Sequence, residues 1–359
     1  MFYSHAKRTK FHRFTKSQRC YSRQAGNLRG GVLVFSGQGT QFPGMGKDLC
    51  SSFPVAKHVF EEANEALGWS LSNVMFTTDK TEQVNLTPFA QPAILVFSIA
   101  LFEIFKEVTG LKITDFSFVS GHSLGEFTAL VASESMSLKT GVHLVHLRGA
   151  AMQACVPSGV PFSMNALLGT SLEDVQETID EIKSERFEPK LQCSIANYNA
   201  LDQVVISGRK DCVDKVILKA KQTGKARHIR AINVSAPFHS EFMCTAADLM
   251  QPPLVAAIMQ PPVIPFLSNV DVDFHVRPPF IKDLLFKQIY STVQWCPIMD
   301  VCNKIGTREF LEIGPKQVLT PLLRRHFVGN RIISCSGLDH VLQFNDVQNG
   351  KDVTKQVTA

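Results

Sequence analysis

The sequence predicts an α/β fold, with a largely parallel sheet in its core and an inserted ferredoxin-like subdomain. Two observations support this prediction. Over the first 150 residues, short apolar strand-like segments alternate with helical patterns, which is typical of helices that cover a parallel sheet. Between residues 157 and 235 the expected order changes to β-α-β-β-α-β, which is that of the ferredoxin-like unit. We therefore expect the core at 31–156 and 236–337, followed by a loose polar tail at 338–359.

The individual elements are predicted from the spacing of apolar residues. A short buried strand is expected at 32–35, a helix with one apolar face at 53–67, and a buried helix that follows Pro92 and contains the apolar run 93–102. A run of ten apolar residues cannot cross a bilayer, so no membrane span is expected. Helices are also expected at 141–152, 171–183, 211–221 and 295–301, and strands at 161–169, 191–196, 203–207, 228–234, 263–267 and 309–313.

The segment from Phe116 to Ala132 contains the most informative pattern of the chain. It starts as an apolar strand, breaks at Gly-His-Ser-Leu-Gly (121–125) and resumes as a helix. A serine at such a strand-turn-helix junction is the nucleophile-elbow pattern of a hydrolase-like core. It would expose Ser123, and the N–H of Leu124 would bind a negative oxygen formed when the serine attacks a carbonyl. The alternative is a glycine turn that contains a serine by chance.

The positive charge of the chain is concentrated at its N-terminus. The formal net charge is +5, yet residues 1–30 hold eight Lys/Arg and no acidic residue, and without them 29 basic residues face 32 acidic ones. A basic, acid-free, hydroxyl-containing start without a long apolar run predicts a mitochondrial transit peptide, and with it a location in the mitochondrial matrix. An expression tag or a basic arm is the alternative.

The cysteines and histidines do not predict a metal site. Nine cysteines are scattered along the chain and none forms C-x-x-C, so neither a disulfide framework nor a zinc knuckle is expected. His143 and His146 could share a helix face, but no acid or cysteine at ligand spacing completes a metal set. We expect two surface histidines.

Three further polar residues stand in patterns that suggest a site. Gln38 lies between two glycines, as in a loop that lets an amide approach a ligand or in an ordinary strand-to-helix turn. Arg148 stands in an apolar helix, so it needs an anionic partner such as a carboxylate unless it extends to the helix surface. His239 lies far downstream of Ser123, as either the general base of a serine nucleophile or a structural histidine.

A basic segment at residues 209–230 indicates what kind of macromolecule the protein could bind. Residues 209–230 carry eight basic and two acidic side chains and no aromatic ring of Phe, Tyr or Trp. Without such rings to stack on bases, nucleic acid is a poor partner for this segment. An acidic protein partner fits better, and a solvated helix face is the alternative.

Seven motifs that occur in order carry a family resemblance. They are GQGTQ (37–41), GHSLGE (121–126), LRG with MQ (147–149 and 152–153), NAL with LG (165–169), VVISG (204–208), SAPFHS (235–240) and EIGP (312–315). With these motifs the chain resembles malonyl-coenzyme A:acyl carrier protein transacylases over about residues 32–330, and with its basic leader it resembles the mitochondrial type. Thr40, Phe127 and Ala236-Pro237 are mild departures from the family pattern.

The resemblance implies roles for the residues singled out above. Ser123 would carry the malonyl group as an ester, and His239 would act as the base, first for the serine and later for the incoming thiol. Backbone N–H groups of Gln38 and Leu124 would form the oxyanion hole. Arg148 would bind the free carboxylate of the malonyl group.

The resemblance further implies a dyad without a third carboxylate, because a backbone carbonyl near 314–318 would orient the histidine, with Gln317 as the candidate. The reaction would transfer malonyl from malonyl-CoA to the phosphopantetheine thiol of acyl carrier protein for fatty acid synthesis, without a metal or redox cofactor. A monomer is expected. Two other interpretations stay open: a serine hydrolase, with water as the acceptor, and a non-catalytic binding protein.

Overall fold

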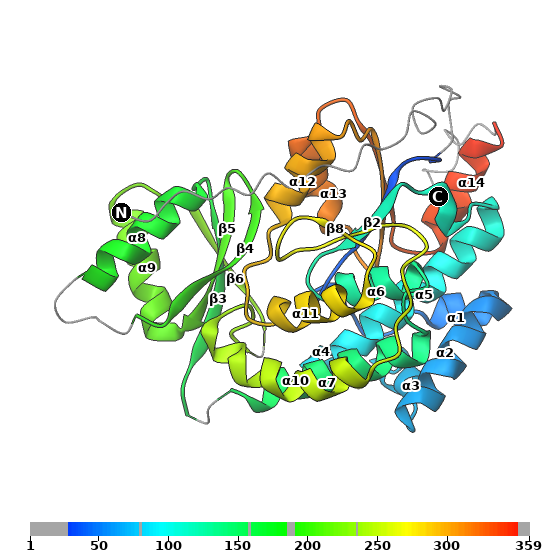
Figure 1. The fold of residues 1–359 in the computed structure, drawn as a ribbon, viewed down its shortest axis with the longest axis horizontal. Helices are drawn as coiled ribbons and strands as arrows, with labels where there is room; N and C mark the ends of the chain where they lie inside the picture. The colour runs from blue at the N-terminus through cyan, green and yellow to red at the C-terminus, as the bar shows by residue number, and fades with distance from the viewer. Residues whose placement is uncertain (1–27, 79–80, 157–158, 185–190, 235, 351–359) are drawn as a thin grey trace.

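A computed structural model describes residues 28–78, 81–156, 159–184, 191–234 and 236–350. All but the last three residues of the predicted transit peptide therefore lie outside the described residues. A six-stranded sheet and a four-stranded sheet organise the chain. Figure 1 shows the smaller sheet, with helices α8 and α9, set to one side of the larger core.

The large sheet has the strand order β10-β9-β1-β2-β7-β8. Its strands are β1 (Val32–Phe35), β2 (Phe118–Gly121), β7 (Phe266–Leu267), β8 (Phe274–His275), β9 (Glu309–Ile313) and β10 (Arg331–Cys335). Strand β1 pairs in parallel with β2 and β9, as do β9 with β10 and β2 with β7, while the edge strand β8 runs antiparallel to β7. This arrangement confirms the predicted, largely parallel sheet.

Helices cover both faces of the large sheet, because the side chains of its central strand alternate between two core clusters. Leu33 and Phe35 pack into one cluster, and Val32 and Val34 into the other. The helices of the core are α1 (Lys47–Ser52), α2 (Pro54–Leu67), α3 (Leu71–Phe76), α4 (Thr81–Asn85), α5 (Thr87–Thr109), α6 (Gly125–Ala132), α7 (Leu138–Ala154), α10 (Cys244–Ala256), α11 (Pro278–Gln288), α12 (Trp295–Lys304), α13 (Leu319–His326) and α14 (Leu338–Gln348), with short 3-10 turns at η3 (Ile113–Asp115) and η4 (Glu241–Met243).

Helix α5 is longer than the sequence predicts. It begins at Thr87 instead of after Pro92 and contains that proline in its second turn, where the ring removes one intrahelical hydrogen bond. By length and composition α5 could cross a membrane, so the argument from ten apolar residues does not apply to it. However, 83% of its apolar window is buried inside the protein, which is the pattern of a core helix.

The four-stranded sheet belongs to the inserted subdomain. Its elements are β3 (Phe162–Leu168), α8 (Leu172–Ser184), β4 (Cys193–Ala200), β5 (Gln203–Arg209), α9 (Lys210–Gln222) and β6 (His228–Ile232). The strand order is β4-β5-β3-β6 and all three neighbouring pairs are antiparallel. This order is that of the ferredoxin-like unit, so the prediction from the element pattern is confirmed.

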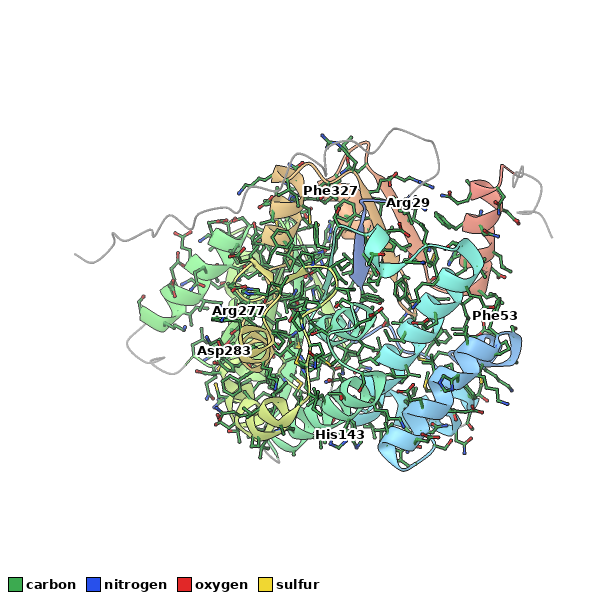
Figure 2. The ribbon with its side chains drawn as sticks, turned by 45° about the vertical axis from the view of Figure 1, so that its right-hand side comes forward. Arg29, Phe53, His143, Arg277, Asp283 and Phe327 are labelled. Atoms are coloured by element: carbon green, nitrogen blue, oxygen red, sulfur yellow. The ribbon has the colours of Figure 1, made fainter. Side chains whose placement is uncertain are left out.

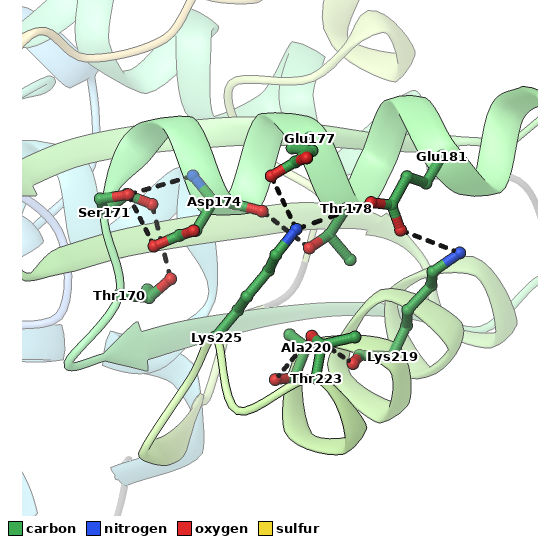
Figure 3. Close-up of polar contacts among 10 residues, drawn as sticks. All are labelled: Thr170, Ser171, Asp174, Glu177, Thr178, Glu181, Lys219, Ala220, Thr223 and Lys225. Atoms are coloured by element: carbon green, nitrogen blue, oxygen red, sulfur yellow. Dashed lines mark hydrogen bonds and ion pairs between the residues drawn. The ribbon is translucent and has the colours of Figure 1, made fainter.

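Ion pairs join α8 to α9 and its following turn in the subdomain. Lys225 Nζ lies 2.8 Å from Glu177 Oε2, and Lys219 Nζ lies 3.1 Å from Glu181 Oε2; Figure 3 marks both contacts with dashed lines. The basic residues of 209–230, which suggested an acidic partner, are thus partly neutralised by acids of the same subdomain. Docking of an acidic protein there would have to compete with these contacts.

Hydrogen bonds attach the subdomain firmly to the core. The N–H of Tyr198 donates to the Val293 carbonyl at 2.9 Å, and the N–H of Val293 donates to the Ala196 carbonyl at 2.9 Å. Nearby, the Thr292 hydroxyl donates to the Ile195 carbonyl at 2.6 Å. Strand β4 is therefore bonded to the segment that precedes α12, and the two sheets form one packed structure around this junction.

The C-terminal segment is structured as far as residue 350, so the prediction of a loose tail was wrong for residues 338–350, while residues 351–359 lie outside the described residues. Helix α14 packs Phe344 against Phe105 of α5, with the ring centroids 5.2 Å apart. Val341 is fully buried and Phe344 is 6% exposed. Two apolar residues three positions apart are enough to form the buried face of this short helix, but too few to stand out in a polar sequence.

Replacing Phe344 with alanine should lower the free energy of unfolding by about 3 kcal/mol, because a buried aromatic ring is lost and a cavity remains. Urea denaturation followed by circular dichroism measures this change. Leu342→Ala on the same helix is the matched control, since Leu342 is 42% exposed, and it should cost about 0.5 kcal/mol or less. If Phe344→Ala also lost only about 0.5 kcal/mol or less, α14 would not contribute to the cooperative core.

Candidate active site

Ser123 stands on the sharp turn between β2 and α6. Its φ is 53°, in the left-handed region that a residue other than glycine occupies at a cost of about 1–3 kcal/mol. Asn269 holds this turn: its Oδ1 accepts a hydrogen bond from Ser123 N at 2.8 Å, and its Nδ2 donates to the Gly121 carbonyl at 2.7 Å. The strained strand-turn-helix junction has the geometry of the predicted nucleophile elbow.

Two glycines let the elbow approach the end of β1. A Cβ atom at Gly37 would lie 2.3 Å from the His122 carbonyl oxygen, and one at Gly125 would lie 2.2 Å from the Phe35 carbonyl oxygen. No side chain fits at such a separation. The loop that follows β1 can therefore lie against the elbow only because both positions are glycine.

His239 lies buried beside Ser123. Its Nε2 is 2.7 Å from Ser123 Oγ, and its Nδ1 is 2.9 Å from the Gln288 carbonyl oxygen and 3.1 Å from that of Ser291. Because carbonyl oxygens only accept, Nδ1 carries the proton and Nε2 is left to accept the serine hydroxyl. Burial, together with the charge of Arg148, lowers the pKa of His239 to about 3. The imidazole is therefore a neutral base at physiological pH.

The carbonyl of Gln288 takes the position that the resemblance assigned to the backbone at 314–318. Gln317 is exposed and does not orient His239, so this prediction was wrong. The acceptor comes instead from the last residue of α11, in a part of the sequence that none of the motifs covers.

Arg148 is buried, with 2% of its surface exposed, although it belongs to the outer helix α7. Its Nη1 donates to Gln91 Oε1 at 2.9 Å, and its Nη2 donates to Gln288 Oε1 at 2.8 Å and to Ser123 Oγ at 3.2 Å. Among the described residues no carboxylate lies within ion-pair distance of Arg148, and its Nε has no partner. A buried guanidinium with a free N–H beside the serine fits the prediction that Arg148 binds an anionic group.

Backbone N–H groups of Gln38 and Leu124 are present at the elbow without acceptors. Within the part of the chain that the structure describes, neither group donates a hydrogen bond. The side chain of Gln38 is held by Thr87 at 3.2 Å and by Gln91 at 3.5 Å, and Gln91 in turn contacts Arg148. Two unpaired backbone donors next to a serine nucleophile fit the predicted oxyanion hole.

Several buried polar residues that hold the site together were missed by sequence reasoning. Glu126 was noticed only as the last letter of a motif, although it lies three positions after Ser123 on α6. Its Oε1 accepts from Asn269 N at 2.5 Å and its Oε2 accepts from Gln288 Nε2 at 2.6 Å. Gln91, Asn269 and Gln288 come from three separate segments, so only the folded chain shows that they meet.

A cavity of about 1240 Å³ opens beside His239. It lies between α8 of the subdomain and the core segments around 239–244 and 290–294. This volume exceeds that of an ordinary small-ligand pocket, and it leaves room for a substrate with a long arm. The wall formed by α8 is acidic, through Glu173, Glu177, Asp180 and Glu181.

The described residues contain no group of three or more His, Cys, Asp or Glu side chains that could hold a metal ion. His143 is exposed at the surface, where Figure 2 labels it. His146 is half-buried, with its Nδ1 2.9 Å from the Pro88 carbonyl oxygen. The expectation of two surface histidines therefore holds for His143, while His146 is a partly buried structural residue.

Several known proteins are similar to this chain in sequence and in fold. The family model described as "Acyl transferase domain" matches residues 32–336. The malonyl CoA-acyl carrier protein transacylase of Bacillus subtilis (strain 168) is 39% identical to this chain over 294 residues, which are 82% of this chain and 89% of that protein. The transacylase of the same name from Escherichia coli (strain K12) is 33% identical over 294 residues, with 82% and 92% covered.

Solved structures with the same fold include the acyl-carrier-protein-S-malonyltransferase from Bartonella henselae. It superposes with a TM-score of 0.82 at 35% identity, and the match covers 89% of this chain and 99% of that one. A malonyl-transacylase in complex with a type II PKS acyl-carrier protein superposes with a TM-score of 0.81 at 32% identity, again covering 89% and 99%.

The depressed pKa of His239 predicts an unusual pH dependence for the reactivity of Ser123. Because the imidazole keeps its free Nε2 until the pH approaches about 3, labelling of Ser123 by a sulfonyl fluoride should stay constant as the pH falls from 8 to 5. Mass spectrometry of the labelled protein measures the rate. For a histidine of ordinary pKa, the neutral fraction would be about tenfold lower at pH 5.5 than at pH 8. A tenfold decline of the labelling rate would therefore contradict a buried, neutral base. His239→Ala is the control and should abolish rapid labelling.

Proposed function

Since this chain belongs to the acyl transferase domain family, among the malonyl CoA-acyl carrier protein transacylases, we propose that it transfers a malonyl group from malonyl-CoA to acyl carrier protein through an ester on Ser123. One observation carries the proposal. A single oxygen, Ser123 Oγ, lies 2.7 Å from His239 Nε2 and 3.2 Å from Arg148 Nη2. A nucleophile, a neutral base and a cation suited to a carboxylate thus meet at one point.

The first half-reaction is acylation of Ser123. As Oγ attacks the thioester carbonyl of malonyl-CoA, His239 Nε2 takes the hydroxyl proton. The N–H groups of Gln38 and Leu124 stabilise the negative charge on the carbonyl oxygen. The carbon–sulfur bond then breaks, the imidazolium gives its proton to the coenzyme A thiolate, and malonyl-Ser123 remains.

The second half-reaction runs the same steps with a different thiol. His239 accepts the proton of the phosphopantetheine thiol of acyl carrier protein, and the sulfur attacks the ester carbonyl of malonyl-Ser123. Collapse of the tetrahedral intermediate returns the proton to Ser123 Oγ. One thioester is exchanged for another, so the chemistry needs no redox or metal cofactor. The large cavity leaves room for the pantetheine arm of each thiol in turn.

Arg148 supplies the selectivity for malonyl. Its guanidinium is already held by the neutral amides of Gln91 and Gln288, which leaves its charge available to the substrate carboxylate. A planar guanidinium and a carboxylate match each other with two parallel hydrogen bonds. Acyl groups without a carboxylate cannot form these charge-assisted hydrogen bonds.

The transacylase predicts a malonyl adduct on the intact protein that acyl carrier protein removes. After mixing with malonyl-CoA, intact mass should show one malonyl ester on the wild type and none on Ser123→Ala. Holo acyl carrier protein should discharge it faster than water does. Discharge by water at the same rate would favour a serine hydrolase instead, and the absence of any adduct with several acyl thioesters would favour a binding protein.

Arg148→Ala should separate substrate selection from chemistry. We expect acylation by malonyl-CoA to fall by about 100-fold, since a charge-assisted bidentate contact is lost. Acylation by acetyl-CoA should rise. Rapid-quench measurements of acyl-enzyme formation with the two substrates check this, and an equal decrease for both would assign Arg148 a structural role.

We further propose that the protein acts in the mitochondrial matrix, in mitochondrial fatty acid synthesis. Eight basic residues and no acidic one within residues 1–30 support this location, and nearly all of that segment lies outside the described residues. A monomer remains the expected oligomeric state.

The leader should direct a fused protein to mitochondria. Residues 1–30 joined to a fluorescent protein should accumulate in the matrix of eukaryotic cells, and the same leader with its eight basic residues changed to glutamine should leave the fusion in the cytosol. Fluorescence microscopy and protease protection of isolated organelles measure the location. A cytosolic wild-type fusion would identify the segment as a basic arm and remove the mitochondrial assignment.

A further inference from the structure

The negative charge that balances Arg148 is the carboxylate of Glu126, and the side-chain amide of Gln288 lies between them. Glu126 is fully buried, as is Gln288, and the side chain of Gln288 lies between the two charged groups. Gln288 Nε2 donates to Glu126 Oε2 at 2.6 Å, while Gln288 Oε1 accepts from Arg148 Nη2 at 2.8 Å. The carboxylate therefore reaches the guanidinium through one neutral side chain.

Glu126 determines which way the Gln288 amide points. Nε2 of Gln288 faces two acceptors, Glu126 Oε2 and the Ser123 carbonyl oxygen, the latter at 2.7 Å. An amide NH₂ group can satisfy both, whereas an amide oxygen in that place would satisfy neither. The oxygen end of Gln288 is thus turned toward Arg148.

The second oxygen of Glu126 extends this control to the nucleophile. Oε1 accepts from Asn269 N, and Asn269 in turn accepts from Ser123 N at the strained turn. The backbone oxygen of Gln288 accepts from His239 Nδ1. One carboxylate is therefore linked, through two intermediate residues, to the serine, the histidine and the arginine of the site.

The charges of Glu126 and Arg148 support each other. Burial raises the pKa of Glu126 to about 8, and the N–H groups of Asn269 and Gln288 and the charge of Arg148 oppose that rise. Burial lowers the pKa of Arg148 to about 10, and the charge of Glu126 opposes that fall. That pKa alone would leave the carboxyl of Glu126 mostly protonated at neutral pH. Both of its oxygens accept from N–H donors, however, and a proton on either oxygen would break one of these hydrogen bonds, so the geometry supports the ionised form.

We propose that Glu126 is a positioning residue for malonyl selection: it balances the buried charge of Arg148 through the Gln288 amide and so leaves the guanidinium free to bind the substrate carboxylate. A carboxylate in direct contact with Arg148 would compete with malonyl for the same N–H groups. A neutral amide competes far less, because charge-assisted hydrogen bonds are about twice as strong as neutral ones. This inference rests on the proposed malonyl transfer.

The first test is Glu126→Gln, with single-turnover acylation by malonyl-CoA and by acetyl-CoA as the readout. A glutamine at position 126 that still accepts from Asn269 N presents its NH₂ group to Gln288, which must then turn its own NH₂ group toward Arg148. The ratio of the malonyl rate to the acetyl rate should fall by about tenfold, because a misdirected donor now faces the guanidinium.

Glu312→Gln is the matched control. Glu312 is also a fully buried glutamate of the core, and its oxygens accept from the backbone N–H groups of Val318, Leu319 and Thr320. Its replacement should lower stability and leave the malonyl-to-acetyl ratio unchanged. Equal slowing of both substrates in Glu126→Gln, with the ratio of the wild type, would reduce Glu126 to a structural role and overturn the proposal.

The double variant Glu126→Gln/Gln288→Glu tests whether the amide matters apart from the charge. It keeps one buried carboxylate but places it directly against Arg148, where it competes with the substrate. We expect the ratio to stay at least tenfold below that of the wild type, and a return to the wild-type ratio would overturn the role of the amide. Because this variant preserves the buried charge, it also provides the test if Glu126→Gln alone does not fold.

Failure of the proposed function would look different. In that case the wild type itself would form no malonyl ester on Ser123, or water would discharge the ester as fast as acyl carrier protein does. Failure of the inference leaves a normal malonyl ester on the wild type, with a ratio that Glu126→Gln does not change.

Discussion

The site depends on keeping one positive charge inside the protein. A guanidinium removed from water needs hydrogen-bond acceptors, and it needs a compensating charge that leaves part of it free for the substrate. Arg148 obtains the acceptors from Gln91 and Gln288 and the compensating charge from Glu126 at a distance. Gln91, Glu126, Arg148 and Gln288 come from α5, α6, α7 and α11, so the site forms only where these four helices converge.

Backbone strain is the second shared property of the site. Ser123 and His239, whose side chains meet, both have positive φ values, of 53° and 55°. Such conformations persist only where neighbouring groups fix them. Asn269 fixes the first through Ser123 N, and the carbonyls of Gln288 and Ser291 hold the imidazole of the second. The protein thus uses its hydrogen-bonding residues to keep two unfavourable turns facing each other.

Local patterns predicted most of the fold and part of the site. The elbow at Ser123 and the β-α-β-β-α-β unit were readable because their signals lie within a short stretch of chain. Gln317 was chosen wrongly because the true acceptor, the carbonyl of Gln288, lies outside every motif and is brought to His239 only by the packing of α11. Glu126 was overlooked because a glutamate at the end of a motif that continues into a helix looks like a surface residue until the helix is seen to be buried on every side.

The burial of helix α5 affects how the chain folds during its synthesis. Its apolar window resembles a membrane span, and its burial depends partly on Phe344 of α14 near the other end of the sequence. During synthesis about 230 residues must follow α5 before that cover exists, while domains begin to fold as they emerge. For most of its translation, the growing chain therefore carries an apolar, helix-forming segment that is not yet fully covered. We expect this segment to be covered by a chaperone until α14 docks, or the docking of α14 to be a slow last step of folding.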